Sequence, residues 1–287
     1  MIYIPSGTYL IGTDKKIGFE TDYETPRTEV TINGFYIDET TVTNQEFMEF
    51  VTATNYQTDA EKIGWSYVFH YFLDEPKKYP LKVPQTSWWH LVEGANWKHP
   101  EGPESDILSR LDHPVVHVSR NDAVAYCQWA GKRLPTEAEW EIAAQGGTNR
   151  EEYYWGDELA RDGVHRCNTW QGEFPNTNTL DDGYAGTAPV KTYDPNPYGL
   201  YQMIGNVWEW CVNPGKIELK SFQLVSGKDF WKVHQVPDDE LYAIKGGSFL
   251  CHYSYCNRYR MCARNSNMSM STSQNLSFRC VKDVNER

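Results

Sequence analysis

The 287-residue chain lacks any long hydrophobic run: its apolar stretches are short and interrupted, and none approaches the ~20 residues of a membrane-spanning helix. The N-terminal stretch, MIYIPSGTYLIG, lacks the basic start, apolar middle and small-residue cleavage site of a signal peptide. Positive charge is scarce and scattered, with 27 Lys and Arg against 39 Asp and Glu and a net charge of -12. We therefore predict a cytoplasmic protein with no membrane span and no nucleic-acid partner.

The familiar catalytic signatures are also absent. The chain has no P-loop, no GxGxxG after a predicted strand, no HExxH and no GxSxG. His113 and His117 in HPVVH have a spacing that a metal site can use, but Pro114 between them disfavours a helix. Histidines on a strand without further ligands are a weak metal signal. The sequence therefore favours a structural role for this pair.

Large aromatic residues and turn formers are abundant instead. The 11 Trp, 19 Tyr, 21 Gly and 15 Pro are spread along the whole length. This combination predicts many short strands, turns and loops with few long helices. A hydrophobic content of 40% supports a sizeable core, and no internal repeat or linker is visible. We predict a single domain over residues 1–287.

Three helices are predicted from capping-box spacing, in which a Ser or Thr cap is followed three residues later by an acid. They begin at Thr43, Ser119 and Thr136, and Gly131 and Gly146 are expected to end the second and third. Strands are expected in GFYIDETTVT, HPVVHVS and FRCVKD, and a turn in TYDPNPYG. The segment 213–239 is polar and is expected to be an irregular surface excursion.

The cysteines are Cys127, Cys167, Cys211, Cys251, Cys256, Cys262 and Cys280. An odd number in a reducing compartment disfavours a disulfide scaffold, although a buried cysteine is often inert packing. Cys251 and Cys256 differ from the others because glycines precede them and polar and aromatic residues surround them. Two soft thiolates suit Cu(I), whereas a closed zinc site requires two more ligands. The residues alone leave a functional thiol pair and a packing pair equally open.

The stretch GGSFLCHYSYCNRYR, followed by ARNSN and NLSFRC, resembles the C-terminal signature of the formylglycine-generating enzyme, or sulfatase-modifying factor, family. The likeness extends through IPSGTYLIGT, VTNQEF, EGANWKHPEGP, GKRLPTEAEWE, NTWQGEFPNTNTLDDGYAGTAPV and NPYGLYQMIGNVWEW. The resemblance implies the family's irregular α/β fold, a mixed α+β arrangement related to C-type lectins and low in regular secondary structure.

The resemblance also implies an activity. Family members use O2 to oxidise a cysteine in a C-x-P-x-R segment of an unfolded sulfatase to Cα-formylglycine. The family's copper-binding cysteines fall on Cys251 and Cys256, which would hold Cu(I). The remaining active-site positions carry over to Ser248, Trp208, Tyr255 and Arg258, and a substrate-groove position carries over to Asn275. A monomer is expected.

Calcium is the second ion that the resemblance implies. The first site falls on Asn168, Thr169, Asp182 and Tyr184, and the second on Gln202, Gly205, Val207 and Glu209. Oxygen ligands in loops suit Ca²⁺, whose role would be to stiffen a loop-rich domain. At the second site, Gln202 stands where the family commonly has asparagine.

Some positions depart from the family pattern. Thr41 and Trp65 occupy positions where eukaryotic members carry acids, and the chain after Trp210 continues differently, which predicts an altered rim of the substrate groove. Two alternatives therefore stay open: a related copper oxidase acting on another peptide or thiol substrate, and a non-catalytic, lectin-like binding module. Cys127 and Cys280 correspond to a pair that can be bridged in secretory relatives, and here we expect them to be close but reduced.

Overall fold

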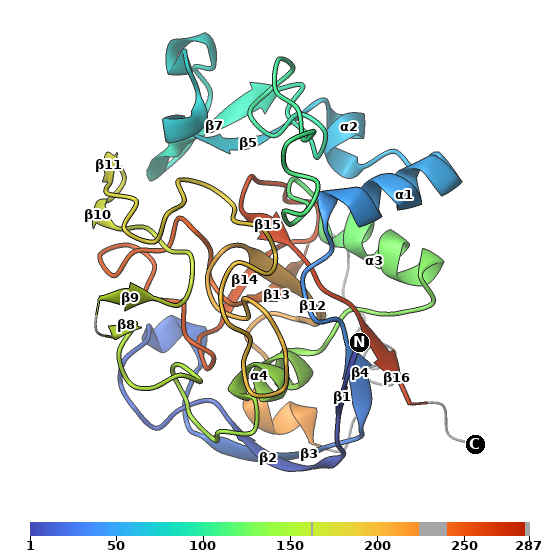
Figure 1. Cartoon of the computed structure of the whole chain (residues 1–287), viewed down its shortest axis with the longest axis vertical. Helices are drawn as coiled ribbons and strands as arrows, with labels where there is room; N and C mark the ends of the chain where they lie inside the picture. Colours follow the sequence, from blue (N-terminus) through green and yellow to red (C-terminus); the bar gives the residue numbers. More distant parts are fainter. Residues whose placement is uncertain (162, 224–239, 285–287) are drawn as a thin grey trace.

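The computed structural model describes residues 1–161, 163–223 and 240–284. Within them, short strands form six separate sheets of two to four strands, and the longest α-helix has 11 residues. Figure 1 shows the sheet that contains β5 and β7 at one end of the molecule, the β2 and β3 hairpin at the other, and the sheet of β12 to β15 between them. The predicted mixed α/β fold with little regular secondary structure is confirmed.

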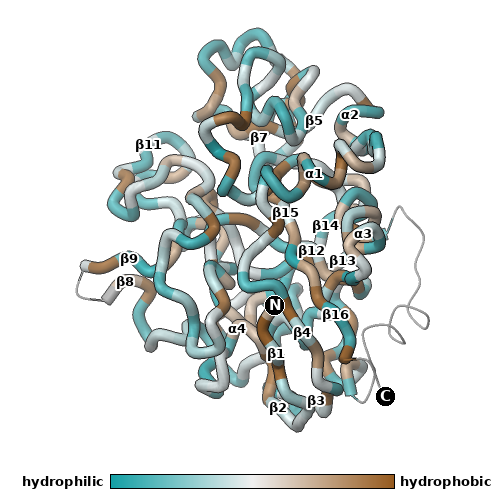
Figure 2. Tube along the Cα trace, turned by 45° about the vertical axis from the view of Figure 1, so that its right-hand side comes forward, coloured by the Kyte–Doolittle hydropathy of each residue, from teal (hydrophilic) through white to brown (hydrophobic). Residues whose placement is uncertain are grey.

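The strands are β1 (Ile2–Ile4), β2 (Gly7–Ile11), β3 (Thr28–Ile32), β4 (Phe35–Ile37), β5 (Trp65–Phe69), β6 (Lys82–Val83), β7 (Thr86–Glu93), β8 (Ala160–Arg161), β9 (Val164–His165), β10 (Gly172–Glu173), β11 (Thr177–Asn178), β12 (Trp208–Pro214), β13 (Leu241–Lys245), β14 (Asn265–Met268), β15 (Leu276–Ser277) and β16 (Val281–Asp283). Figure 2 shows brown hydrophobic segments that are short and alternate with teal ones. No helix among the described residues is long and apolar enough to cross a membrane.

The ends of the described chain lie in one sheet. Strand β4 pairs with β1 on one side and with β16 on the other, so that Ile37 is opposite both Ile2 and Val281. The strands predicted in GFYIDETTVT and FRCVKD are therefore real but short, and each covers only three residues. Because β16 pairs with β4, the C-terminal part of the chain, which carries the cysteine pair, is hydrogen-bonded to the N-terminal part.

Each predicted helix is confirmed with its capping box: α1 (Asn44–Thr54), α3 (Arg120–Trp129) and α4 (Glu137–Gln145). Helix α2 (Asp59–Ile63) was not predicted, although Thr58 and Glu61 also form a capping box and Gly64 ends the helix with a positive φ of 87°. Its five residues are too few to show a helical hydrophobic period, which is the stronger sequence signal.

Two predictions about secondary structure are wrong. HPVVHVS is not a strand: it makes a single bridge, from Pro114 to Thr43, and His117 has a positive φ of 59° that breaks an extended backbone. The segment 213–223 is not a surface excursion, because Asn213 lies fully buried in β12 and the 3-10 helix Leu219–Phe222 packs Leu219 and Phe222 into the core. The rest of that prediction, 224–239, lies outside the described residues.

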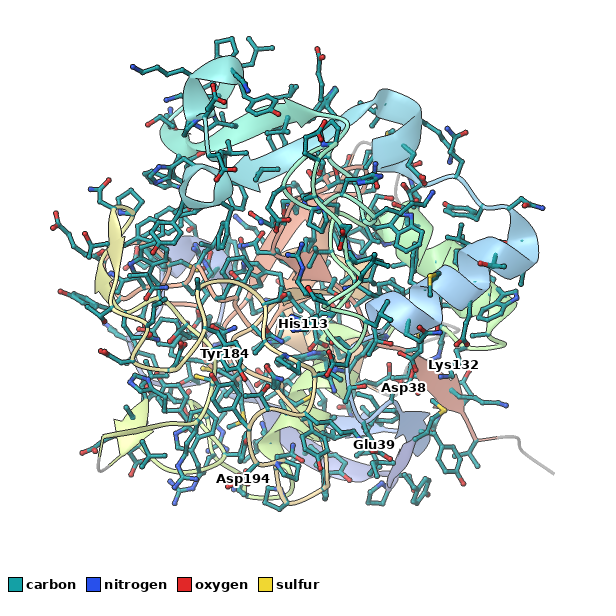
Figure 3. All side chains as sticks on the ribbon, turned by 45° about the horizontal axis from the view of Figure 1, so that its top comes forward. Asp38, Glu39, His113, Lys132, Tyr184 and Asp194 are labelled. Atoms are coloured by element: carbon teal, nitrogen blue, oxygen red, sulfur yellow. The ribbon has the colours of Figure 1, made fainter. Side chains whose placement is uncertain are left out.

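Both ring nitrogens of His117 and Nδ1 of His113 have protein partners. His117 is fully buried, with Nδ1 2.7 Å from Ser66 Oγ and Nε2 2.8 Å from the Pro100 carbonyl oxygen. His113 Nδ1 lies 2.9 Å from Thr187 Oγ1, and Figure 3 labels its ring. These contacts agree with the structural role that the sequence favours for both.

The central sheet has the strand order β14-β13-β12-β15, and every residue of β12 up to Asn213 is buried. Its charged side chains are paired: Glu209 accepts from Arg279 at 2.6 and 2.7 Å, and Lys245 donates to Glu141 at 3.0 Å. Removing one partner of a buried pair typically costs ~3–5 kcal/mol, so these pairs fix how the strands and α4 meet. The sheet thereby gives the segment after β13 a rigid base.

Candidate active site around a buried thiol pair

Two consecutive glycines turn the chain as it leaves β13. Gly246 and Gly247 have φ angles of 95° and 76°, which are rarely adopted by residues with a side chain. A Cβ on Gly247 would lie 3.0 Å from Tyr259 Cα, so glycine also allows the two backbone segments to approach. The turn delivers Ser248 and, three residues later, Cys251 to the end of the central sheet.

The sulfur atoms of Cys251 and Cys256 lie 2.8 Å apart. Both side chains are buried, at 2% and 6% exposure. A short turn joins them: the Cys256 amide donates to the His252 carbonyl at 2.8 Å, and the Cys251 amide donates to the Ser248 carbonyl at 2.9 Å. The backbone thus brings two sulfurs together across a five-residue separation.

The two thiols differ in acidity. Burial raises the pKa of Cys251 well above its usual range, and its hydrogen bond with Cys256 adds to this. The pKa of Cys256 is lowered, first by that hydrogen bond from Cys251 and then by the positive charge of Arg258, against the opposing effect of burial. The pair therefore gives up its first proton at Cys256, and the thiolate is the form that binds metals and attacks electrophiles.

Ser248 and Asn275 lie next to the thiols. The amide Nδ2 of Asn275 donates to Ser248 Oγ at 2.9 Å, and Ser248 Oγ lies 4.0 Å from the Cys251 sulfur. Asn275 is itself held from two sides, because Ser273 Oγ donates to its Oδ1 at 2.9 Å and its carbonyl accepts from the Trp208 amide at 2.8 Å. These contacts fix a hydroxyl beside the sulfur.

Arg258 is an ion-paired side chain. Its Nε and Nη2 donate to the two carboxylate oxygens of Asp22 at 2.5 and 3.1 Å, and its guanidinium carbon lies 4.3 Å from the centre of the Phe19 ring. Asp22 is 2% exposed. This carboxylate partner of Arg258 lies 236 residues earlier in the chain, too far for the sequence to indicate the pair.

A cavity of about 360 Å³ opens onto the thiol pair. Its described lining comes from the β5–β7–β6 sheet on one side, with Tyr67 and Trp88, and from the central sheet and the segment after it on the other. All of the predicted active-site and substrate residues line it: Trp208, Ser248, Cys251, Tyr255, Cys256, Arg258 and Asn275. The structure brings together residues that the sequence spreads over three segments.

Similarity to known proteins shows the family to which this chain belongs. The profile of the family described as sulfatase-modifying factor enzyme 1-like domain matches residues 1–284. The formylglycine-generating enzyme of Thermomonospora curvata is 49% identical over 284 residues, which cover 99% of this chain and 93% of that protein. This chain belongs to the formylglycine-generating enzyme, or sulfatase-modifying factor, family.

Family membership does not by itself fix the activity. The mouse protein named inactive C-alpha-formylglycine-generating enzyme 2 is 42% identical over 288 residues, covering 99% of this chain and 86% of that one. The fold is also that of PvdO from Pseudomonas aeruginosa, with a TM-score of 0.70 at 22% identity over 98% of this chain and 93% of that chain. The activity of a family member therefore depends on the residues of its site.

An aromatic wall of the cavity was not predicted from the sequence. Phe174 stacks on Tyr255 with ring centres 4.8 Å apart, and the Trp88 ring meets both edge-on, at 5.3 and 4.9 Å. Trp88 lies on β7 and Phe174 follows β10, so no local pattern links them to Tyr255. Aromatic content alone could not single them out among 11 Trp and 11 Phe.

The positions where this family member departs from the pattern fall in different places. Trp65 lies on β5, with its ring 5.0 Å from that of Tyr67, which lines the cavity. Thr41 instead lines a separate surface hollow together with Asp38 and Glu39. The residues after Trp210 continue β12 and are buried. The predicted altered rim therefore does not arise from Cys211 to Asn213, which are absent from the described lining.

The residues assigned to the first calcium site are close together. The Asp182 carboxylate accepts from the Thr169 and Tyr184 amides at 2.9 and 3.0 Å, and Figure 3 labels Tyr184. The side-chain amide of Gln171 also donates to Asp182 at 2.9 Å and to the Thr169 carbonyl, so a cation would take the place of this neutral donor. The buried Asn168 Oδ1 has no hydrogen-bond partner among the described residues. A buried oxygen without a partner is costly, so this donor set fits an oxygen-seeking cation.

The second calcium site fits less well. Gln202 Oε1 is also buried without a partner among the described residues. However, both carboxylate oxygens of Glu209 accept hydrogen bonds from Arg279, and Oε2 also accepts one from Trp140 Nε1 at 2.7 Å. A cation at this site would have to share Glu209 with a buried guanidinium. Of the two assignments, the geometry supports the first more strongly.

Proposed function

We propose that this chain is a formylglycine-generating oxidase that acts on a cysteine of an unfolded sulfatase. The observation that carries the proposal is the buried pair of sulfurs, 2.8 Å apart, at the end of a cavity large enough for a peptide segment. A packing pair would be enclosed by apolar side chains. Here the pair meets Arg258, Ser248 and an open cavity.

The donor set suits Cu(I). The described residues contain no group of three or more His, Cys, Asp or Glu side chains that could hold a metal ion, so Cys251 and Cys256 offer two sulfurs and no hard ligand. Thiolates select soft ions, and zinc requires more ligands than this pair provides. When bound by these two cysteines, Cu(I) supplies the one-electron chemistry through which O2 oxidises a thiol-bearing carbon.

The chain's own residues prepare the site. Cys256 supplies the first thiolate because its pKa is lowered, and Cys251 remains hydrogen-bonded beside it. Asn275 holds the Ser248 hydroxyl next to Cys251, where that hydroxyl can donate to a sulfur or oxygen atom of the reacting group. The aromatic wall of Trp88, Phe174 and Tyr255 gives this end of the cavity an apolar side against which a peptide side chain can pack.

The substrate motif is the finer part of the proposal. By its likeness to formylglycine-generating enzymes, we infer that the peptide contains C-x-P-x-R. A second candidate is an oxidase for another cysteine peptide, and one observation favours it: the described lining of the cavity contains no Asp or Glu to receive the motif's arginine. Trp65, beside Tyr67, leaves an aromatic surface in that region instead.

We also propose a structural Ca²⁺ at Asn168, Asp182 and the carbonyl oxygens of Thr169 and Tyr184. The unpartnered Asn168 Oδ1 supports it. This ion would tie the segment that follows Cys167 to the loop that contains Asp182, and so hold the Phe174 region against the cavity.

The test is conversion of a short C-x-P-x-R peptide, followed by mass for replacement of the thiol by an aldehyde, with and without added Cu(I). We expect copper-dependent conversion by the parent and none by Cys251→Ser or Cys256→Ser. Conversion of a different cysteine peptide, with C-x-P-x-R untouched, would favour the second candidate. Failure to bind Cu(I) and to convert any cysteine peptide would contradict both.

A further inference from the structure

Two carboxylates on one N-terminal segment form ion pairs with arginines of the segment that carries Cys256. Asp22 pairs with Arg258, and Glu24 pairs with Arg260 at 2.7 and 2.9 Å, each through both carboxylate oxygens. Both carboxylates are buried, at 2% and 3% exposure. Each of these bidentate guanidinium–carboxylate pairs is called a fork below. The two forks are chemically alike and join the same two segments of the chain.

The two forks differ in what they face. Arg260 is 1% exposed and does not appear in the described lining of the cavity, so its fork joins two segments inside the protein. The side chain of Arg258 is 19% exposed and lines the cavity beside Cys256. Asp22 therefore binds Arg258 on the protein side, and the exposed part of the Arg258 side chain faces the cavity in which a peptide would bind.

The donors of Arg258 divide accordingly. Nε and Nη2 are bonded to Asp22, and the Phe19 ring covers the guanidinium plane at 4.3 Å. This leaves Nη1 as the nitrogen not engaged by Asp22, while the guanidinium also interacts with the Cys256 side chain. An unrestrained arginine samples many rotamers, so a buried carboxylate that fixes the planar fork also fixes where Nη1 points.

We propose that Asp22 is a positioning residue for substrate binding: it holds Arg258 so that Nη1 donates to a backbone carbonyl of the bound peptide. The inference rests on the proposed function, since it requires a peptide in the cavity. A backbone carbonyl is the partner that suits this donor, because it is present in every peptide whatever side chains flank the cysteine.

The test compares Asp22→Asn with Glu24→Gln as the matched control, since each removes the charge of one fork. Two quantities are measured: KM and kcat for the C-x-P-x-R peptide, and the Kd of the same peptide with serine in place of cysteine, which requires no turnover. We expect Asp22→Asn to raise KM and Kd about tenfold with kcat within about threefold. Glu24→Gln should leave KM and Kd unchanged, and Asp22→Glu should restore most of the loss.

A double variant separates positioning from general stability. If Asp22 acts only through Arg258, adding Asp22→Asn to Arg258→Gln changes Kd no further. Additive losses, an unchanged Kd in Asp22→Asn, or an equal rise in Glu24→Gln would overturn the inference. If Asp22→Asn fails to fold, Arg258→Lys tests the inference instead, because lysine keeps the charge but cannot form a bidentate contact with Asp22. The same rise in Kd is expected for this variant.

The outcome for the proposed function is read separately. A parent that neither converts nor binds the peptide contradicts the proposed function and, with it, this inference. A parent that converts the peptide, beside an Asp22→Asn variant of equal Kd and KM, contradicts the inference alone.

Discussion

The chain contains two buried thiol pairs that are nearly equal in geometry and differ in surroundings. The sulfurs of Cys251 and Cys256 lie 2.8 Å apart, and those of Cys127 and Cys280 lie 3.2 Å apart. The expectation that Cys127 and Cys280 lie close is thus confirmed, and their reduced state stays a prediction. A short distance between sulfurs is shared by both pairs, so it does not distinguish a reactive pair from a packing pair.

The environment makes the distinction. All four cysteines belong to the same hydrophobic core cluster. Cys127 and Cys280 lie in its part that contains Tyr126 and Phe278, whose rings are 5.4 Å apart. Burial raises the pKa of Cys280 well above its usual range, and the contact with Cys127 and the charge of Asp38 add to this. Lys132, near Asp38 in Figure 3, is engaged by that carboxylate at 2.7 Å. Among the described residues, Cys251 and Cys256 line the cavity of about 360 Å³, and Cys127 and Cys280 do not. Asp38 raises the pKa of Cys280 more than Lys132 lowers it, whereas the charge of Arg258 lowers the pKa of Cys256.

The largest expected effect comes from truncating one member of each pair. We expect Cys256→Ala to lower kcat/KM for peptide conversion by about 10³-fold or more, because a ligand and the first thiolate are lost. Cys280→Ala should leave kcat/KM within about twofold and lower the free energy of unfolding by about 1–2 kcal/mol. Steady-state kinetics and urea unfolding of both variants check this. Equal kinetic losses in the two variants would remove the distinction between the pairs.

The next largest effect is expected from removing the Ser248 hydroxyl, which lies beside the Cys251–Cys256 pair. Ser248→Ala should lower kcat by about 10- to 100-fold while Cu(I) still binds in equal stoichiometry, since the sulfurs remain. Ser277→Ala is the control, because Ser277 is also fully buried and its Oγ has no partner among the described residues. Activity that falls equally in both variants would instead point to a general packing defect.

A smaller effect is expected in thiol reactivity. Because the pKa of Cys256 is lowered, its thiolate is present at a pH at which an ordinary cysteine is still protonated. In metal-free protein, iodoacetamide should label Cys256 at lower pH than a free cysteine, and Cys280 only after unfolding. Arg258→Gln should move the Cys256 profile to higher pH. Peptide mapping by mass measures both, and preferential labelling of Cys280 in folded protein would contradict the comparison.

The two thiol pairs can be compared only at a pH at which the protein stays folded, and the buried His117 lowers the stability of the fold in acid. Burial lowers the pKa of His117 to about 4 from an ordinary 6.5. Because the folded-state pKa is the lower one, the stability that this neutral ring contributes is present above pH 6.5 and is lost as the pH falls toward 4. We expect this ring to account for about 3 kcal/mol of the stability lost between pH 7 and pH 4. His117→Asn, which tolerates a positive φ, should flatten that slope in urea unfolding; an unchanged slope would refute it.

Local signals predicted the parts of the fold that depend on neighbours in sequence. Capping boxes placed the starts of α1, α3 and α4, because a cap is settled within one helical turn. The same reasoning failed at HPVVHVS, where His117 adopts a positive φ while bonding to Ser66 and Pro100. It failed at Asn213 too, since its polar side chain is buried by bonds to Glu137. In both cases distant partners overrode the local preference.

The sequence by itself determined the donor chemistry: two soft thiols five residues apart after a pair of glycines, and a likeness that named the family. Tertiary structure alone decided which pair of close sulfurs faces a cavity, which one becomes acidic, and which side chains surround it. Asp22 contacts Arg258 across 236 residues, and Tyr255 is contacted by Trp88 from β7 and by Phe174 from the turn after β10. The physical reason is that the burial, the pKa and the solvent access of a side chain depend on the groups close to it in space. Those groups are far apart in the sequence, where no local pattern indicates that they are in contact.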